Sequence, residues 1–260
     1  MAYWQDRMAK AQTTLTAKRV KEIEKQMKKY YGKSMERVIE DFEATYNKIL
    51  IRQAEGKEVT PADLYRLDSY WKMQGKLKLE LQKMGDKQIS LMSKIFELQF
   101  FDVYYSIALE TDAAFGNIST QAVKQMINQI WCADGKSWSQ RIWENTQLLA
   151  DTLNEGLIHC VATGKKASEL KKVLQERFNV SYSRADALVR TEMTHIQTQA
   201  AQKRYEDLGI KEVMIWADKD ERRCEVCGEL HEKKYTAGSH IPIPAHPRCR
   251  CCIVPVVETK

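Results

Sequence analysis

The sequence predicts a mainly α-helical protein with a body of long helices and a small C-terminal α+β module. Glycine and proline are scarce, with 11 and 5 residues among 260, which argues against a turn-rich all-β fold. Apolar residues recur at three- and four-residue spacing as far as residue 209, a pattern typical of amphipathic helices. From residue 210 onward short strand-like runs replace it, and five of the seven cysteines lie between Cys224 and Cys252.

The composition excludes two classes of protein. A hydrophobic content of 43% is enough to form a core, which excludes wholesale disorder. No apolar run reaches the ~18 uncharged residues that a membrane-spanning helix needs. The first ten residues lack the apolar core of a signal peptide. We therefore expect synthesis in the cytoplasm and no membrane segment.

The net charge of +6 is unevenly distributed. Residues 1–100 contain 20 Lys and Arg against 14 Asp and Glu, whereas residues 101–260 contain 21 of each. The simplest interpretation is a solvated helix surface. The alternative is a weak contact of the basic N-terminal region with nucleic acid or with an acidic protein face.

The N-terminal half is predicted to be helical almost throughout. Residues 1–52 form either two helices or one helix interrupted at Gly32, because the apolar spacing continues on both sides of that glycine. Thr60 is a typical N-cap, followed by Pro61 and Asp63 in the first turn, and we expect this helix to end at Gly85. A further helix from residue 86 to about 110 carries an aromatic cluster that is expected to belong to the core.

The C-terminal half continues with shorter helices and then strands. Capping residues delimit the helices, with starts at Ser119, at Ser137 or Ser139, at Ser168 and at Ser181 or Ser183, and ends at Gly164 and Gly209. Residues 211–218 resemble a strand, and Pro255 makes the closing apolar run an edge strand. This pattern divides the chain into a helical region (1–136), a second helical part (137–209) and a terminal module (210–260).

The terminal module contains two half-sites typical of a metal centre. Cys224-x-x-Cys227 is followed after 18 residues by His246-x-x-Cys249-x-Cys251. Zinc prefers four tetrahedral thiolate and imidazole ligands, and its binding can fold a segment that is too small for a core of its own. Cys224 and Cys227 form the secure half of the site, whereas the other three side chains compete for two places. We expect Zn²⁺ as a structural cofactor, with free or redox-active thiols as the alternative.

A second polar group lies within the last long helix. Arg190, Glu192 and His195 are close at helical spacing, and Asp220 precedes the first cysteine pair, as does Asp218. General acid–base chemistry is conceivable here. A salt-bridge network that docks the helix on the metal module is the favoured interpretation.

These residues resemble a known family. The runs RADALVRTEMTH, DERRCEVCGELH and IPAHPRCRCCIVPV, with the earlier SWSQRIWENTQLLADTLNEGLIHCVATG, are similar to the Mu F-like head morphogenesis proteins of tailed phages, also called minor head or minor capsid proteins. The resemblance covers residues 137–257 and is looser over residues 1–136. Three positions depart from the usual pattern: Ala245 replaces a Pro, Arg248 replaces an Asn, and Cys252 is an additional thiol.

The resemblance implies a low-copy structural protein of the virion that is made in the host bacterial cytoplasm. It would act in procapsid and head assembly, lie in the head interior or at the portal vertex, and contribute to DNA packaging or ejection. Its partners would be the portal protein, contacted through residues 1–136, and the scaffolding or major capsid protein. The motif implicates Arg190, Thr191, Glu192 and His195 in the helix, and Asp220 and the two half-sites in the module.

Two other functions remain open from the residues alone. Cysteine and histidine knuckles also stabilise small metal-dependent nucleases of the His-Asn-His type, in which His231, His240 or Asp218 would complete the site. A DNA-binding adaptor would use the basic N-terminal region. The favoured expectation is a structural protein with no turnover on any substrate.

Overall fold

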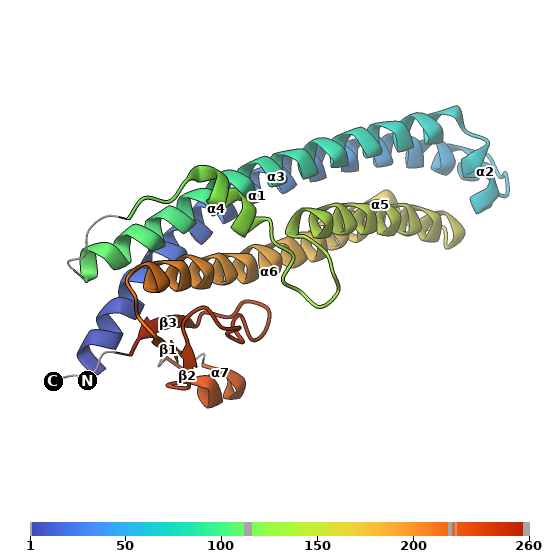
Figure 1. The fold of residues 1–260 in the computed structure, drawn as a ribbon. Helices are drawn as coiled ribbons and strands as arrows, with labels where there is room; N and C mark the ends of the chain where they lie inside the picture. The colour runs from blue at the N-terminus through green and yellow to red at the C-terminus, as the bar shows by residue number, and fades with distance from the viewer. Residues whose placement is uncertain (1, 112–115, 218–219, 222, 257–260) are drawn as a thin grey trace. The chain divides into compact units, whose positions relative to one another are not determined.

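The structure, a computed structural model, describes residues 2–111, 116–217, 220–221 and 223–256. Its elements are, in order, α1 (Ala2–Ala54), α2 (Pro61–Tyr65), α3 (Asp68–Glu110), α4 (Thr120–Ile127), α5 (Trp138–Ala162), α6 (Ala167–Asp207), β1 (Glu212–Trp216), α7 (Glu225–Leu230), β2 (Lys234–Thr236) and β3 (Cys252–Pro255) (Figure 1). This confirms the mainly α fold with a small C-terminal α+β module. Among the described residues, no helix combines the length and the apolar character that crossing a bilayer requires.

The predicted interruption at Gly32 is wrong, because helix α1 runs through this residue without a break. A Cβ added at Gly32 would meet nothing within 4 Å, so no close contact requires glycine there. A glycine inside a helix costs roughly 1 kcal/mol relative to alanine. Packing of the apolar stripe on both sides of Gly32, including the fully buried Ile23, Met27 and Phe42, offsets that cost.

The predicted helix end at Gly85 is wrong. The N-terminal cap is confirmed, since the backbone amide of Thr60 donates to Asp63 Oδ2 at 2.9 Å. The short helix α2 ends at Tyr65, however, and α3 continues from Asp68 through Gly85. A Cβ on Gly85 would lie 2.6 Å from Cζ3 of Trp143, so the glycine makes room for an indole ring rather than ending a helix.

The predicted break between two helices near residue 180 is also wrong, because α6 is continuous from Ala167 to Asp207. Ser181 is buried in the middle of the helix, and its hydroxyl accepts a hydrogen bond from Asn145 Nδ2 at 3.0 Å. A tertiary hydrogen bond therefore takes the place of the predicted cap. Gly209 follows the helix with φ of 69°, as a C-terminal cap requires.

The three strands form one antiparallel sheet in the order β2-β1-β3. Strand β3 therefore lies at an edge, as Pro255 predicted. The sheet is attached to the helices by buried hydrogen bonds: Gln12 Nε2 of α1 donates to the carbonyl of Ile253 at 3.0 Å, and Tyr205 Oη of α6 donates to the same oxygen at 3.3 Å. These bonds anchor β3, which directly follows the second metal half-site in the sequence.

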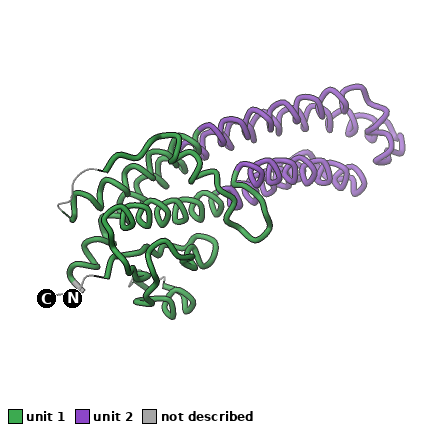
Figure 2. The backbone as a smooth tube through the Cα atoms, in the orientation of Figure 1, with its two compact units in different colours: residues 1–24, 91–138, 186–260 green, residues 25–90, 139–185 purple. Residues whose placement is uncertain are grey.

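The described chain divides into two compact units, coloured in Figure 2. Unit 2 comprises residues 25–90 and 139–185, and it consists of helical segments only. Its helices are joined by buried polar contacts such as that from Tyr70 Oη to Asn154 Oδ1 at 2.9 Å. Unit 1 comprises residues 1–24, 91–138 and 186–260, and it contains the sheet and the whole cysteine cluster.

Candidate metal centre

The first half of the site is a cysteine pair at the start of α7. Cys224 is the N-cap of this helix, and its Sγ accepts a hydrogen bond from the backbone amide of Cys227 at 3.4 Å. The Cys227 side chain is buried, whereas Cys224 is exposed. The turn thus directs two sulfurs toward one point, as the two-residue spacing predicted.

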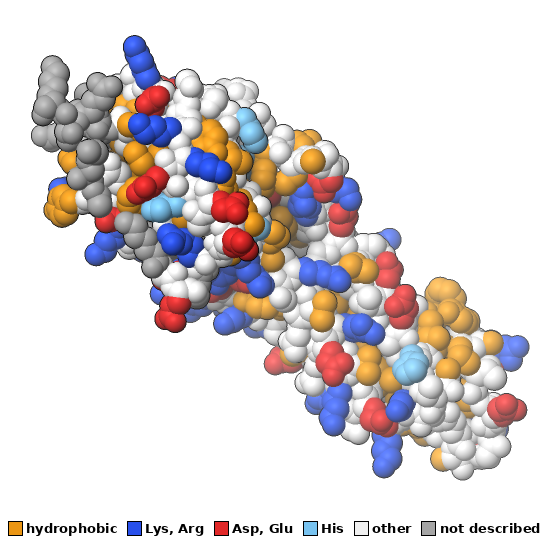
Figure 3. All heavy atoms as spheres, turned by 90° about the horizontal axis from the view of Figure 1, so that it is seen from below, with side chains coloured by type: hydrophobic (Ala, Val, Ile, Leu, Met, Phe, Trp, Pro, Cys, Tyr) orange, Lys and Arg blue, Asp and Glu red, His pale blue; other side chains and the backbone are white. Residues whose placement is uncertain are grey.

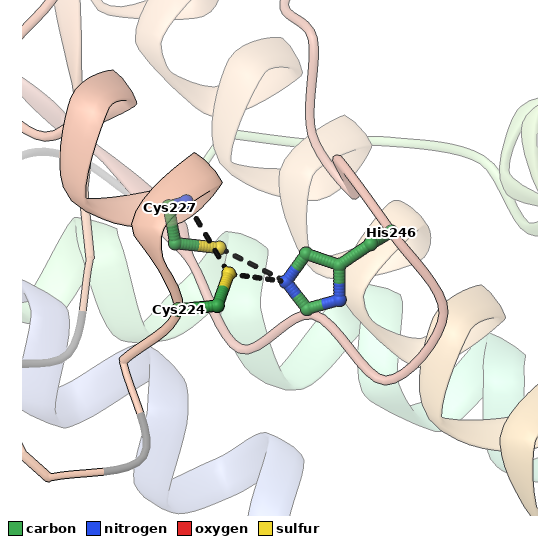
Figure 4. A group of neighbouring side chains, drawn as sticks. All are labelled: Cys224, Cys227 and His246. Atoms are coloured by element: carbon green, nitrogen blue, oxygen red, sulfur yellow. Dashed lines mark hydrogen bonds between the residues drawn. The ribbon is translucent and has the colours of Figure 1, made fainter.

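His246 approaches this pair from a separate segment. Its Nε2 lies 3.3 Å from Cys224 Sγ and 3.1 Å from Cys227 Sγ, and Figure 4 shows the imidazole directed at both sulfurs. The other ring nitrogen, Nδ1, is 2.8 Å from the carbonyl of Pro247. A carbonyl only accepts, so Nδ1 carries the proton and the lone pair of Nε2 faces the sulfurs. This is the tautomer that a metal-binding histidine needs.

The remaining candidates form a second group that shares one residue with the first. The ligand atoms of Cys227, Cys249 and Cys251 lie within 4.8 Å of one another, as do those of Cys224, Cys227 and His246. The Sγ atoms of Cys227 and Cys249 are 3.8 Å apart. Tetrahedral zinc with Zn–S bonds of about 2.3 Å separates its sulfurs by roughly that distance. The structure therefore places the five predicted ligands in two overlapping groups that share Cys227, and each group could hold a metal ion.

The electrostatics of the cluster favour one thiolate even without a cation. Hydrogen bonds from the Cys251 thiol and from backbone amides lower the pKa of Cys249 to about 5. The pKa of Cys251 is raised, because its thiol donates that hydrogen bond and is buried. Burial raises the pKa of Cys227 to about 12. Deprotonating further thiols in this dry site requires a compensating positive charge, and a divalent cation supplies it.

Protonation of His246 responds to the same surroundings. Burial opposes the charged ring, but the hydrogen bond to Pro247 and the neighbouring cysteines together raise the pKa of His246 above its usual value.

The donor set of sulfur and imidazole nitrogen suits zinc rather than calcium or magnesium, which prefer oxygen.

Asp220, which precedes the first cysteine pair in the sequence, binds the segment that carries the second half-site. Its carboxylate accepts two hydrogen bonds of 2.7 Å from the guanidinium of Arg250, which lies between Cys249 and Cys251 in the sequence. This bidentate pair links the loop before α7 to the segment that carries the second half-site. Asp218 lies outside the described residues.

The predicted polar cluster of α6 separates into two parts. Arg190 pairs with Glu24 and with Asp186. Glu192 and His195 both contact Trp131 instead. The sequence analysis did not identify Trp131. Trp131 Nε1 donates to Glu192 Oε2 at 3.1 Å, and its ring stacks on His195 with centroids 4.3 Å apart. No spacing pattern pointed to Trp131, because it lies more than 60 residues away in sequence.

His195 lines a cavity of about 730 Å³ between α6, the segment 126–133 and the loop 238–245. Burial lowers the pKa of His195 to about 4, so the imidazole is neutral at physiological pH. A neutral, buried ring of this kind lacks the pKa near 7 that general acid–base catalysis favours.

The other singled-out histidines and cysteines lie outside the cluster. His231 Nδ1 accepts a hydrogen bond from the amide of Ala217 at 3.3 Å, and His240 is exposed at the cavity. Cys252 is buried, and its Sγ contacts the carbonyl of Trp216 at 3.7 Å, which confirms its predicted packing in the module. Cys160 of α5 is buried, and Cys132, in the segment between α4 and α5, is half-buried.

Comparison with known proteins gives one family and one relative. Residues 151–254 match the family described as phage Mu protein F like protein. The chain is also 29% identical over 144 residues to the NAD(+)–arginine ADP-ribosyltransferase EFV of Enterococcus faecalis, with 48% of this chain and 29% of that protein covered. The chain thus spans less than a third of that relative. No solved structure matches the chain significantly.

The family match covers the C-terminal half of α5, all of α6, β1 and β2, most of β3 and every candidate ligand. The resemblance carried by the runs around α6 and the two half-sites is therefore confirmed where those runs lie. Residues 151–254 thus form a region that is similar to the phage Mu protein F like family.

Proposed function

We propose that the chain is a minor head protein that acts in procapsid and head morphogenesis, bound to the portal at one vertex. The observation that carries the proposal is the family domain at residues 151–254. The domain occupies only part of the chain, so the helices of residues 1–136 are available for a partner. Within this proposal they contact the portal ring.

The metal in this account is zinc, and its role is structural. Structural zinc sites use four protein ligands, whereas catalytic sites use three and keep one position for water. The cluster offers five sulfur and nitrogen donors, which is more than a closed site needs. Bound there, zinc would cross-link the start of α7 to the segment that leads into β3. This closed donor set supports a structural protein over a metal-dependent nuclease.

Surface charge supports a protein partner more than DNA. On the face shown in Figure 3, Lys and Arg side chains are interspersed with Asp and Glu. Several basic groups are also paired, as Arg19 is with Asp102 at 2.8 Å and Lys76 with Asp41 at 2.5 Å. Nucleic-acid binding usually requires a field of one sign. Any DNA contact of the basic N-terminal region would be secondary to the protein contacts.

The test is the protein content of the particle. We expect the chain at a few copies in purified procapsids and heads, located in the interior or at the portal vertex. We also expect it to co-purify with the portal protein when the two are co-expressed. Particles that assemble, package and eject DNA normally without the chain, or an equal copy number of chain and major capsid protein, would contradict the proposal.

A further inference from the structure

Helix α6 contacts the backbone of the second half-site through two threonine hydroxyls. Thr191 Oγ1 accepts a hydrogen bond from the amide of Arg248 at 3.1 Å. Thr194 Oγ1 donates to the carbonyl of Cys249 at 2.5 Å. Both bonds end on the short segment between His246 and Cys251, which we call the ligand loop (residues 246–251). The loop that carries three candidate ligands is thus held by a helix that contributes no candidate ligand itself.

A salt bridge holds the same loop at Arg248, whose backbone conformation is rare. Arg248 has φ of 63°, in the left-handed region that side-chain-bearing residues rarely adopt. Its guanidinium pairs with Asp186 of α6 at 3.0 Å, and Asp186 is itself held by Arg190 at 3.2 Å. The strained conformation reverses the chain between His246 and Cys249, so both side chains can turn toward Cys227. The helix contacts stabilise a conformation that the loop alone would not favour.

We propose that Asp186, Thr191 and Thr194 are positioning residues of the metal centre, which fix the ligand loop on α6 and set its affinity for zinc. The inference rests on the proposed zinc site and adds the residues that control it. The reason is preorganisation, because a loop already held in its binding conformation loses less freedom when the ion binds. Second-sphere contacts of this kind typically change metal affinity by 10- to 100-fold.

Docking of the ligand loop on α6 and zinc binding should favour each other. A ligand that binds only the docked conformation also stabilises that conformation. The segment just before His246, residues 238–245, forms one wall of the cavity that contains His195. Zinc binding should therefore also slow local opening of that wall, away from the metal itself.

The chain offers a matched control for the two threonines. Thr198 lies one turn further along α6, is buried, and donates its hydroxyl to the carbonyl of Thr194 at 2.9 Å within the helix. Thr191 makes the same kind of helix-internal bond, to the carbonyl of Ala187. The Thr194 hydroxyl lies 3.2 Å from the carbonyl of Arg190, but its single proton is directed to the closer carbonyl of Cys249. They differ from Thr198 in their additional bonds to the ligand loop. Valine at each position removes the hydroxyl and keeps the branched shape.

The experiment measures zinc affinity of the full chain by competition with a chromogenic chelator. We expect Thr191→Val and Thr194→Val to weaken zinc binding about tenfold or more, with Thr198→Val unchanged within about twofold. Thr194→Ser keeps the hydroxyl and should retain wild-type affinity. The visible spectrum of the Co²⁺-loaded protein should change in Thr194→Val and be restored in Thr194→Ser, which a general loss of helix stability would not produce.

Amide hydrogen exchange measures the opposite direction, the effect of zinc on the cavity wall. Zinc should slow amide exchange in residues 238–245 of the wild type and do so less in Asp186→Asn, a second variant that removes the Arg248 pair. Equal zinc affinity in all three valine variants, with wild type binding tightly, would overturn the positioning role and leave the zinc site intact. A wild-type chain that binds no zinc would instead overturn the zinc proposal itself.

Discussion

Cys227 belongs to both groups of candidate ligands, and this makes it the key residue of the site. Its sulfur lies 3.1 Å from His246 Nε2 and 3.8 Å from Cys249 Sγ. The sequence predicted the five ligands as residue types, because two chelating half-sites at knuckle spacing are rare. It could not predict which side chains share a position, because that depends on how the loop before α7 meets the ligand loop.

Replacing Cys227 should therefore reduce zinc binding and thermal stability more than replacing any other cysteine. We expect Cys227→Ser to abolish stoichiometric zinc binding and to lower the melting temperature of the purified chain. Cys252→Ala is the matched control, since Cys252 is equally buried in the same module but packs against Trp216. Metal analysis after gel filtration measures the first effect, and thermal unfolding measures the second. Full zinc occupancy in Cys227→Ser would show that the ion is held elsewhere.

His195 predicts a specific dependence of stability on pH. Its pKa is lowered from 6.5 to about 4 by burial, so the unfolded chain binds the proton more tightly than the folded chain does. Stability from this residue is complete above pH 6.5 and falls as the pH drops toward 4. The full effect is about 3 kcal/mol for a shift of this size.

The variant that isolates this effect is His195→Phe, which keeps a planar ring against Trp131 and cannot titrate. The other ionisable groups around the cavity are Glu192 beside Trp131, and Cys132, Lys203, Glu206 and His240 in its lining; all of them remain in the variant. We expect the free energy of unfolding of His195→Phe to change less between pH 7 and pH 4.5 than that of the wild type. Parallel curves for the two proteins would refute the assignment.

At the scale of the elements, two errors of prediction have the same origin. Gly85 and Ser181 both carry the signals of a helix end, and both lie inside long helices. In each case a partner distant in sequence decided the outcome: Trp143 packs against Gly85, and Asn145 binds Ser181. Local signals predicted the caps at Thr60 and Gly209 correctly. Helix ends follow tertiary packing when a capping residue is buried.

This explanation predicts opposite effects at two glycines of α3. Gly75→Ala should stabilise the chain by about 0.5–1 kcal/mol, because a Cβ there meets nothing within 4 Å and alanine is the better helix former. Gly85→Ala should destabilise it by about 1–3 kcal/mol, because the added methyl would lie 2.6 Å from the Trp143 ring. Chemical denaturation of the two variants gives both values. A stabilising Gly85→Ala would mean that the indole moves aside without cost.

At the scale of the whole molecule, the family domain and the metal cluster coincide. Residues 151–254 include all five candidate ligands and the α6 side chains that hold the ligand loop. The sequence indicated this region through its motif, but the contacts of Thr191 and Thr194 with the loop appeared only in the structure, because they join positions more than 50 residues apart. The domain is thus a helix and a metal module that stabilise each other.

Zinc K-edge X-ray absorption on the purified full chain tests most directly whether this domain contains a structural zinc ion without an open coordination position. We expect one zinc per chain, coordinated by four sulfur and nitrogen atoms at distances of about 2.3 and 2.0–2.1 Å. A coordination shell that includes a water oxygen would contradict a structural role and favour an enzyme. A chain that contains no zinc after purification and reconstitution would contradict the metal centre altogether.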